Sequence, residues 1–358
     1  MENYIKEKIK TLKPYVVQEN DCTIKLDANE NSENLFRSCF NDFVKKVSEG
    51  TINRYPDPSS TLLREKVANY VGEGVDRDNI ICGNGSDELI SCIISTFVGE
   101  SDTVVTHSPT FSMYKISNQI LGGKFIEVPS NEKFEVNIDE IINVSNENNA
   151  KLIILCNPNN PTGTIIKRED IEKVINSTNA VVIVDEAYYE FLGESLVDIA
   201  KENKRVIVLR TLSKGFALAG ARCGYLVASL DTVNSILKVK PPYNLNTLTQ
   251  YAGECILDNY EKVSKSIERI KSQRDAMLPK LREVKGLTVY DTGANFILVK
   301  TDKCSEVIKK FEEEKILVRG FSEGALENCI RFSIGFENEN NKVIEIISEV
   351  LENENCKA

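Results

Sequence analysis

The sequence predicts an α/β protein whose large domain holds a mostly parallel, seven-stranded sheet covered by helices, with a smaller α+β domain beside it. The first observation is a series of short apolar runs that do not alternate with polar residues and are rich in Val and Ile, as strands buried on both faces are. The second is that helical patterns separate several of these runs. The third is that the pattern changes after about Pro241. The seven runs are 80–82, 104–106, 125–128, 152–156, 181–184, 206–209 and 224–228.

Helices are predicted where apolar residues recur at helical spacing. Ser60–Val71 and Ser86–Val98 are two such segments, and each would cover one face of the sheet. After Pro241 the order is different. A long helical stretch over about Thr249–Val284 precedes two strand-like runs, a helix, a strand pair and a last helix near Lys342–Leu351.

These segments suggest a division of the chain, which at 358 residues exceeds the usual size of a single core. We expect an N-terminal arm over 1–25 and a large domain over 46–245. The smaller domain would combine 26–45 with 246–358.

Composition excludes several classes of function. The net charge of -10 argues against nucleic acid and anionic membranes as partners, so an anionic ligand would need local arginines. The charged start of the chain is unlike a signal peptide, and no apolar run is long enough to span a bilayer. The ten cysteines form no CxxC pair and are typical of reduced core cysteines in a cytoplasmic protein. Because His107 is the single histidine, we expect no His-rich metal site.

The segment Arg210–Arg222 carries the most chemical information. Its lysine, Lys214, follows the buried strand predicted over 205–209. Desolvation there would favour the neutral, nucleophilic amine, which can form a Schiff base with an aldehyde. Thr211, Ser213 and Arg222 offer hydroxyls and a guanidinium, which are common partners of a phosphate. An aldehyde that carries a phosphate is pyridoxal 5'-phosphate (PLP). The alternative is a surface lysine after a core strand.

A glycine turn at Gly83–Asp87 follows another predicted strand and opens a helix. Glycines allow close backbone approach, and the free N–H groups at a helix start bind phosphate. Gly85, Ser86 and Asp87 are therefore candidate phosphate-binding residues. The alternative is a turn in which Ser or Asp caps the helix.

Two further polar segments end predicted strands, where open α/β sheets bind ligands. Cys156–Gly163 contains two prolines and a glycine that would hold Asn160 at the strand end, although a purely structural loop is the alternative. Asp185 follows four apolar residues, and a buried carboxylate needs a cationic partner. A protonated pyridine nitrogen is such a partner; a helix cap or a salt bridge to an arginine is the alternative.

Together these segments resemble the fold type I superfamily of PLP enzymes, to which aspartate aminotransferase belongs. The resemblance implies that Lys214 is the Schiff-base lysine and that Asp185 binds the pyridine nitrogen. It makes Asn160 and Tyr188 the partners of the ring hydroxyl, and Phe111 the aromatic residue stacked on the ring, with a core aromatic as the alternative. The implied phosphate-binding residues are Gly85, Ser86, Thr211, Ser213 and Arg222.

A closer resemblance is to the histidinol-phosphate aminotransferases, a class II family. It rests on the segments 26–31, 55–58, 83–90, 185–191 and 242–244. It implies a homodimer with shared active sites, in which Tyr55 reaches the cofactor phosphate of the neighbouring subunit. Arg331 matches the arginine that binds the acidic group of the substrate, Arg319 matches a second one, and Tyr15 is a further substrate contact. The chain departs from the family at 32–36, where a proline and a glycine are usual.

Three functions follow from these features. The first is transamination between histidinol phosphate, a phosphorylated amino alcohol, and the 2-oxo acid 2-oxoglutarate. The second is another PLP activity on the same scaffold: threonine-phosphate decarboxylation or aromatic-amino-acid transamination. The third is a non-catalytic regulator with a PLP fold. The acidic charge and the short segment before Leu26 argue against the DNA-binding module that such regulators carry.

Overall fold

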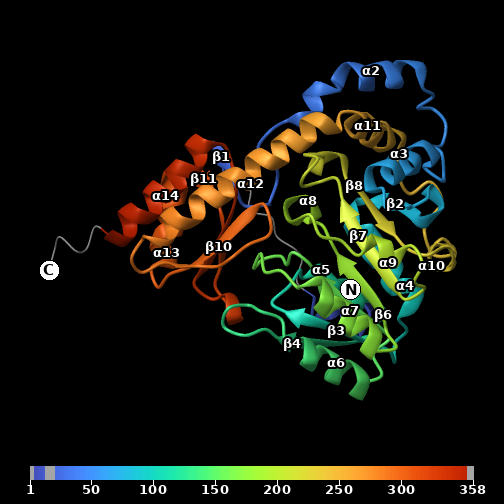
Figure 1. Cartoon of the computed structure of the whole chain (residues 1–358), viewed down its shortest axis with the longest axis horizontal. Helices are drawn as coiled ribbons and strands as arrows, with labels where there is room; N and C mark the ends of the chain where they lie inside the picture. The colour runs from blue at the N-terminus through green and yellow to red at the C-terminus, as the bar shows by residue number, and fades with distance from the viewer. Residues whose placement is uncertain (1–3, 13–20, 353–358) are drawn as a thin grey trace.

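The structure is a computed structural model that describes residues 4–12 and 21–352. Its centre is a seven-stranded sheet with the strand order β2-β8-β7-β6-β5-β3-β4 (Figure 1). Strand β8 runs antiparallel to both of its neighbours, and the other strands pair in parallel. The mostly parallel, seven-stranded sheet is therefore confirmed. The strands are β2 (Ile80–Asn84), β3 (Thr103–Ser108), β4 (Lys124–Pro129), β5 (Leu152–Cys156), β6 (Val181–Asp185), β7 (Val206–Thr211) and β8 (Cys223–Val227).

The central strands are buried on both faces, as their apolar runs predict. In β5, Ile153 and Leu155 join the core on one face, whereas Leu152 and Ile154 join the core on the other. Because alternate side chains point to opposite faces, both faces need helices. The helices encoded between these strands, just before them or just after them are α3 (Thr61–Val71), α4 (Gly85–Phe97), α5 (Met113–Leu121), α6 (Ile138–Glu147), α7 (Arg168–Ser177), α8 (Tyr189–Leu192), α9 (Val197–Ala200) and α10 (Leu230–Ile236).

A second group of elements, orange to red in Figure 1 except for the blue β1, lies beside this sheet. It contains a four-stranded antiparallel sheet and a parallel pair formed by β1 and β11. The sequence predicted a strand pair after α13. The structure has three short strands there, so this prediction is wrong. The elements are β1 (Ile24–Lys25), β9 (Thr288–Val289), β10 (Phe296–Lys300), β11 (Ile316–Leu317), β12 (Arg319–Phe321), β13 (Cys329–Ser333), α12 (Tyr260–Arg282), α13 (Cys304–Glu313) and α14 (Glu337–Glu352).

The long helical stretch predicted over about 249–284 is present, but as two helices rather than one. The chain forms α11 (Thr247–Asp258) and α12, which Asn259 separates with a non-helical backbone. The side chain of Asn259 donates a hydrogen bond to the carbonyl oxygen of Cys255 at 3.0 Å. Such local bonds compete with the helix ladder. The break lets α11 pack against α3, while α12 packs against α14 and α8.

The two N-terminal helices pack against other helices. Helix α1 (Glu7–Lys10) contacts α5, and α2 (Phe40–Glu49) contacts α11. The division into an arm and two domains stays a prediction. Short 3-10 helices complete the fold at Leu35–Ser38, Arg77–Asn79, Ala219–Ala221 and Gly324–Leu326. Within 4–12 and 21–352, none of the helices has the length and apolar character needed to cross a membrane.

Candidate active site

A pocket of about 120 Å³ lies where β5, β6 and β7 end. Asp185 is the last residue of β6, and Lys214 follows the end of β7 by three residues. The loop after β5 contributes Asn160. Ten of the residues predicted to bind a cofactor line this one pocket: Ser86, Asp87, Phe111, Asn160, Asp185, Tyr188, Thr211, Ser213, Lys214 and Arg222.

Lys214 lines this pocket and the larger cavity described below. Its Nζ donates a hydrogen bond to the carbonyl oxygen of Ala28 at 2.7 Å. Burial, together with the positive charge of Arg331, lowers the pKa of Lys214 to about 8. A sizeable fraction of this lysine is therefore a neutral amine near pH 7 to 8, the form that attacks a carbonyl carbon.

Asp185 lies in the wall of the pocket and is 2% exposed. One carboxylate oxygen accepts a hydrogen bond from the Tyr114 hydroxyl at 2.6 Å, and the other accepts the backbone N–H of Ala187 at 3.1 Å. Burial raises the pKa of Asp185 to about 6, against the lowering effect of these two bonds. Both donors are neutral, so the site would stabilise a cation placed against this carboxylate.

A polar cradle built on glycines lies beside the pocket residues Ser86 and Arg222. Gly85 has a φ of +76°, and a Cβ there would lie 2.6 Å from Nη2 of Arg222. A Cβ on Gly224 would lie 2.6 Å from the backbone nitrogen of Ser86. Glycine at both positions therefore keeps open the space around the start of α4, where backbone N–H groups favour an anion.

Side chains from three elements complete this cradle. The hydroxyl of Thr211 donates to that of Ser213 at 2.9 Å, and Arg222 forms an ion pair with Asp87 at 2.9 Å. Helix α4 begins at Gly85, and its N-cap residue Asn84 makes no side-chain capping bond. The alternative that Ser or Asp caps the helix is therefore wrong.

The predicted aromatic residues Phe111 and Tyr188 line the pocket, as does Tyr114. Phe111 is partly buried and contacts Tyr114 edge to face, with ring centroids 5.6 Å apart. The buried hydroxyl of Tyr188 accepts a hydrogen bond from the side-chain amide of Asn29 at 2.9 Å. Burial raises the pKa of this phenol, which stays protonated at neutral pH.

A larger cavity of about 580 Å³ shares four residues with this pocket: Phe111, Asn160, Tyr188 and Lys214. Arg331 on β13 and Arg319 on β12 line it, directly opposite each other across the two strands. Like charges in such a pair repel, so the pair favours an anionic ligand. Arg331 is 8% exposed; it donates to Oδ1 of Asn160 and, at 2.6 Å, to the carbonyl oxygen of Asp27.

Among the described residues, the predicted Gly85 and Tyr55 line neither cavity; Gly85 lies next to the pocket residue Ser86. Tyr55 is 79% exposed and stacks on Tyr243 with ring centroids 4.5 Å apart. Its own subunit therefore does not bring it to the site. Tyr15 lies outside the described residues.

Sequence reasoning missed a buried ion pair behind the site. Glu186 and Arg210 are 1% and 2% exposed at their side chains and lie 2.9 Å apart. Each neighbours a site residue, Asp185 or Thr211, and strand alternation turns the pair away from the pocket. Glu186 also accepts the backbone N–H of Leu196 at 2.8 Å. The sequence signal for this ion pair was Arg210, a charged residue directly after the buried run 206–209.

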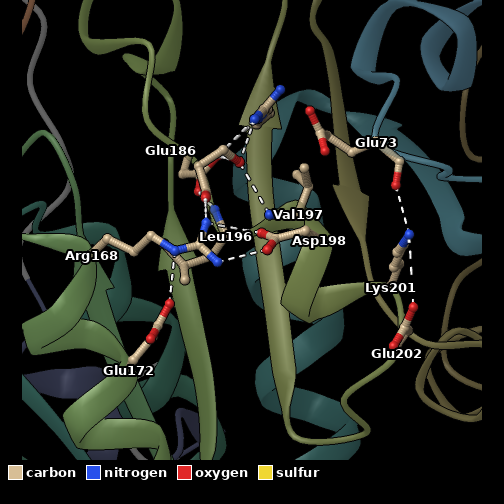
Figure 2. Close-up of polar contacts among 11 residues, drawn as sticks. Glu73, Arg168, Glu172, Glu186, Leu196, Val197, Asp198, Lys201 and Glu202 are labelled. Carbon is tan, nitrogen blue, oxygen red and sulfur yellow. Dashed lines mark hydrogen bonds and ion pairs between the residues drawn. The ribbon is translucent and has the colours of Figure 1, made fainter.

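This pair continues into a surface network (Figure 2). Ser195 donates its hydroxyl to Glu186 at 2.7 Å and accepts Arg168 at its carbonyl oxygen, also at 2.7 Å. Arg168 in turn pairs with Asp198 and Glu172, as the dashed lines of Figure 2 show. The ends of β6 and β7 are thereby tied to α7 and α9.

Tyr114 and Asn29 were also missed as site residues. Tyr114 lies three residues after Phe111, and its backbone N–H donates to the Phe111 carbonyl oxygen at 3.4 Å, so one turn holds both residues. That spacing was the signal for Tyr114. Nothing local in the sequence pairs Asn29 with Tyr188, which is 159 residues away.

Comparisons with known proteins agree with this geometry. A family model described as aminotransferase class I and II matches residues 22–347. The chain is 39% identical over 351 residues to the histidinol-phosphate aminotransferase of Clostridium kluyveri, with 98% of this chain and 99% of that protein covered.

Two solved structures share the fold. Histidinol-phosphate aminotransferase from Sinorhizobium meliloti, in complex with pyridoxal-5'-phosphate, has a TM-score of 0.86 at 22% identity over 98% of each chain. L-threonine-O-3-phosphate decarboxylase from Porphyromonas gingivalis has a TM-score of 0.79 at 23% identity over 92% of this chain and 99% of that one. At these identities the two structures bear on the fold alone. The family model and the near-full-length relative go further: this chain belongs to the class I and II aminotransferase family.

Proposed function

We propose that this protein is a PLP-dependent aminotransferase that converts histidinol phosphate and 2-oxoglutarate to imidazole acetol phosphate and glutamate, a step of histidine biosynthesis. The observation that carries the proposal is that two cavities share four lining residues and therefore lie next to each other. One holds an amine and a buried carboxylate, and the other ends at two arginines. The similarity over nearly the full length to a histidinol-phosphate aminotransferase supports the substrate.

The residues of the smaller pocket fit PLP. The glycine cradle with Ser86 and Arg222 would hold its phosphate, and Asp185 would pair with its ring nitrogen. Phe111 would stack on the ring, and Lys214 would hold the aldehyde carbon. When bound, PLP draws electrons away from the Cα of the substrate.

Other residues complete the proposed cofactor site. Tyr188 and Asn160 would bind the ring hydroxyl; the remaining phosphate partners are Gly85, Asp87, Thr211 and Ser213. Asp87 would act through its ion pair with Arg222, since a carboxylate repels phosphate.

Lys214 has a second proposed role as the general base. Once the substrate amine takes its place, its Nζ is free to remove the proton from Cα. The carbonyl oxygen of Ala28, 2.7 Å away, orients that nitrogen. Lys214→Ala should abolish turnover, and borohydride should attach the cofactor to Lys214 in the native protein.

The larger cavity suits a substrate with an acidic end. A guanidinium binds phosphate and carboxylate equally well in two-pronged geometry. Arg331, with Arg319 beside it, would therefore accept the phosphate of histidinol phosphate in one half-reaction and the carboxylate of glutamate in the other. Tyr15 and Asn160 stay proposed substrate contacts.

A substrate panel tests this assignment against decarboxylation and aromatic transamination. Purified protein with PLP is given histidinol phosphate, threonine phosphate or an aromatic amino acid, each with 2-oxoglutarate. We expect glutamate to form fastest with histidinol phosphate and no CO2 to be released. CO2 release from threonine phosphate with no reaction of histidinol phosphate would refute the substrate and keep the cofactor. Absence of PLP binding would favour the remote alternative, a non-catalytic regulator.

We also propose a cytoplasmic homodimer. The exposed Tyr55 is available to a second copy of the chain, and nine free cysteines in the described residues agree with a reducing compartment. Mixing inactive Lys214→Ala subunits with Tyr55→Ala subunits tests the shared site, because one site of each hybrid has both native residues. Activity should exceed that of either variant alone; with subunit exchange verified, no gain would refute the proposed role of Tyr55.

A further inference from the structure

Tyr114 has a contact that the assigned cofactor residues do not explain. Its side chain is 1% exposed and lies at the start of α5, with its hydroxyl 2.6 Å from Asp185. This distance is typical of a strong hydrogen bond from a hydroxyl to a carboxylate. The ring also packs edge to face against Phe111. One residue thus touches both the carboxylate and the aromatic ring of the pocket.

We propose that Tyr114 is a positioning residue of this active site, whose hydroxyl keeps Asp185 charged and oriented toward the pocket while its ring supports Phe111. The inference rests on the proposed function, because a protonated ring nitrogen needs an ionised carboxylate beside it. A protonated Asp185 would give up that charge pairing.

The electrostatic surroundings explain why a donor is needed. Burial raises the pKa of Asp185 to about 6, and the Tyr114 bond is the largest effect that lowers it. The charges of Asp87 and Glu186 act in the same direction as burial. Cys156 and Tyr188, which line the same pocket, both have a raised pKa and stay neutral at pH 7, whereas the cations Lys214 and Arg222 line it as well. His107, which accepts the backbone N–H of Cys156, has a pKa lowered by burial to about 4 and is neutral too.

Loss of the Tyr114 hydroxyl should raise the pKa of Asp185. In the native protein, ionisation of Asp185 is already disfavoured, so loss of the Tyr114 donor moves the titration to higher pH. A hydrogen bond to a charged group corresponds to a shift of about one to two pH units. Part of Asp185 would then be protonated at pH 7, and PLP would bind less tightly.

The test begins without cofactor. Protein labelled with ¹³C at the aspartate carboxyls is titrated, and the Asp185 signal is identified by its loss in Asp185→Asn. Tyr114→Phe should raise the midpoint by about one to two pH units. Tyr70→Phe is the matched control. The Tyr70 hydroxyl donates to another carboxylate, that of Glu190, at 3.2 Å, and Tyr70 lines neither active-site cavity. A shift no larger than that of Tyr70→Phe overturns the inference.

A second variant covers the case in which Tyr114→Phe does not fold. Site-specific 3-fluorotyrosine at position 114 keeps the ring and strengthens the donor, so the midpoint should fall. An unchanged or raised midpoint overturns the inference.

A binding measurement separates this inference from the proposed function. Tyr114→Phe should raise the Kd for PLP at pH 7 several-fold, but not in an Asp185→Asn background; an equal loss in both backgrounds means a merely structural role. A shifted midpoint in a protein that never binds PLP would refute the cofactor and keep the Tyr114–Asp185 pair. Tight PLP binding with an unchanged Asp185 midpoint would refute the role of Tyr114 and keep the proposed cofactor.

Discussion

Replacing Arg331 tests whether one guanidinium serves both half-reactions. Its two terminal nitrogens already bond Asn160 and the carbonyl oxygen of Asp27, which hold the side chain in one position inside the larger cavity. Arg331→Ala removes a preorganised cation, and the Arg319 side chain, on the neighbouring strand, is the remaining guanidinium of this strand pair.

The expected loss follows from the value of one charged contact. A hydrogen bond to an ionised group contributes about 1.5–3 kcal/mol, and each 1.4 kcal/mol changes a rate about tenfold. A buried guanidinium lies at the upper end, so kcat/KM should fall by roughly 10²-fold in each half-reaction. Arg331→Lys should recover little, because one ammonium cannot bond Asp27, Asn160 and the substrate in the same planar arrangement.

Single-turnover absorbance of the bound cofactor measures the two half-reactions separately, one with histidinol phosphate and one with glutamate. Arg282→Ala is the control, since Arg282 pairs with the exposed Asp291 away from both cavities. If only one half-reaction slows in Arg331→Ala, the two anions do not share this residue and the reasoning is wrong.

Three further predictions concern the amine, the buried pair and the cradle. In protein without PLP, the rate at which Lys214 captures an aldehyde should rise about tenfold per pH unit up to about pH 8 and then level off, because only the neutral amine reacts; a stopped-flow rate that still climbs at pH 10 contradicts this. Arg210→Met leaves Glu186 buried without its cation and should lower the free energy of unfolding, measured with urea, by about 3–5 kcal/mol. Adding Glu186→Gln to the same chain should restore part of this loss. Equal stability of the single and double variants would argue against the ion pair. Gly224→Ala places a methyl 2.6 Å from the Ser86 nitrogen and should weaken PLP binding, whereas Gly220→Ala, with no heavy atom within 4 Å, should not; equal Kd values would show that the cradle tolerates the methyl.

Local patterns in the sequence were enough to predict the large sheet. Runs such as 152–156 and 206–209 are read from consecutive residues, and burial on both faces requires them to be apolar throughout. The position of Lys214 after such a run is equally local. The helix break at Asn259 was not predicted, because the apolar spacing continues through it and a single asparagine does not by itself end a helix.

The site shows the same division between local and distant information. The sequence by itself determined which polar residues end strands and therefore which could meet at one edge of the sheet: Asn160, Asp185 and Lys214. Only the tertiary structure decided their partners, since Tyr114 meets Asp185 across 71 residues and Arg331 meets Asn160 across 171. Periodicity fixes the face on which a side chain lies, but contacts between distant elements depend on how their helices and strands pack. The same reason explains why Arg319 faces Arg331: a strand register, not a sequence motif, brings the two charges together.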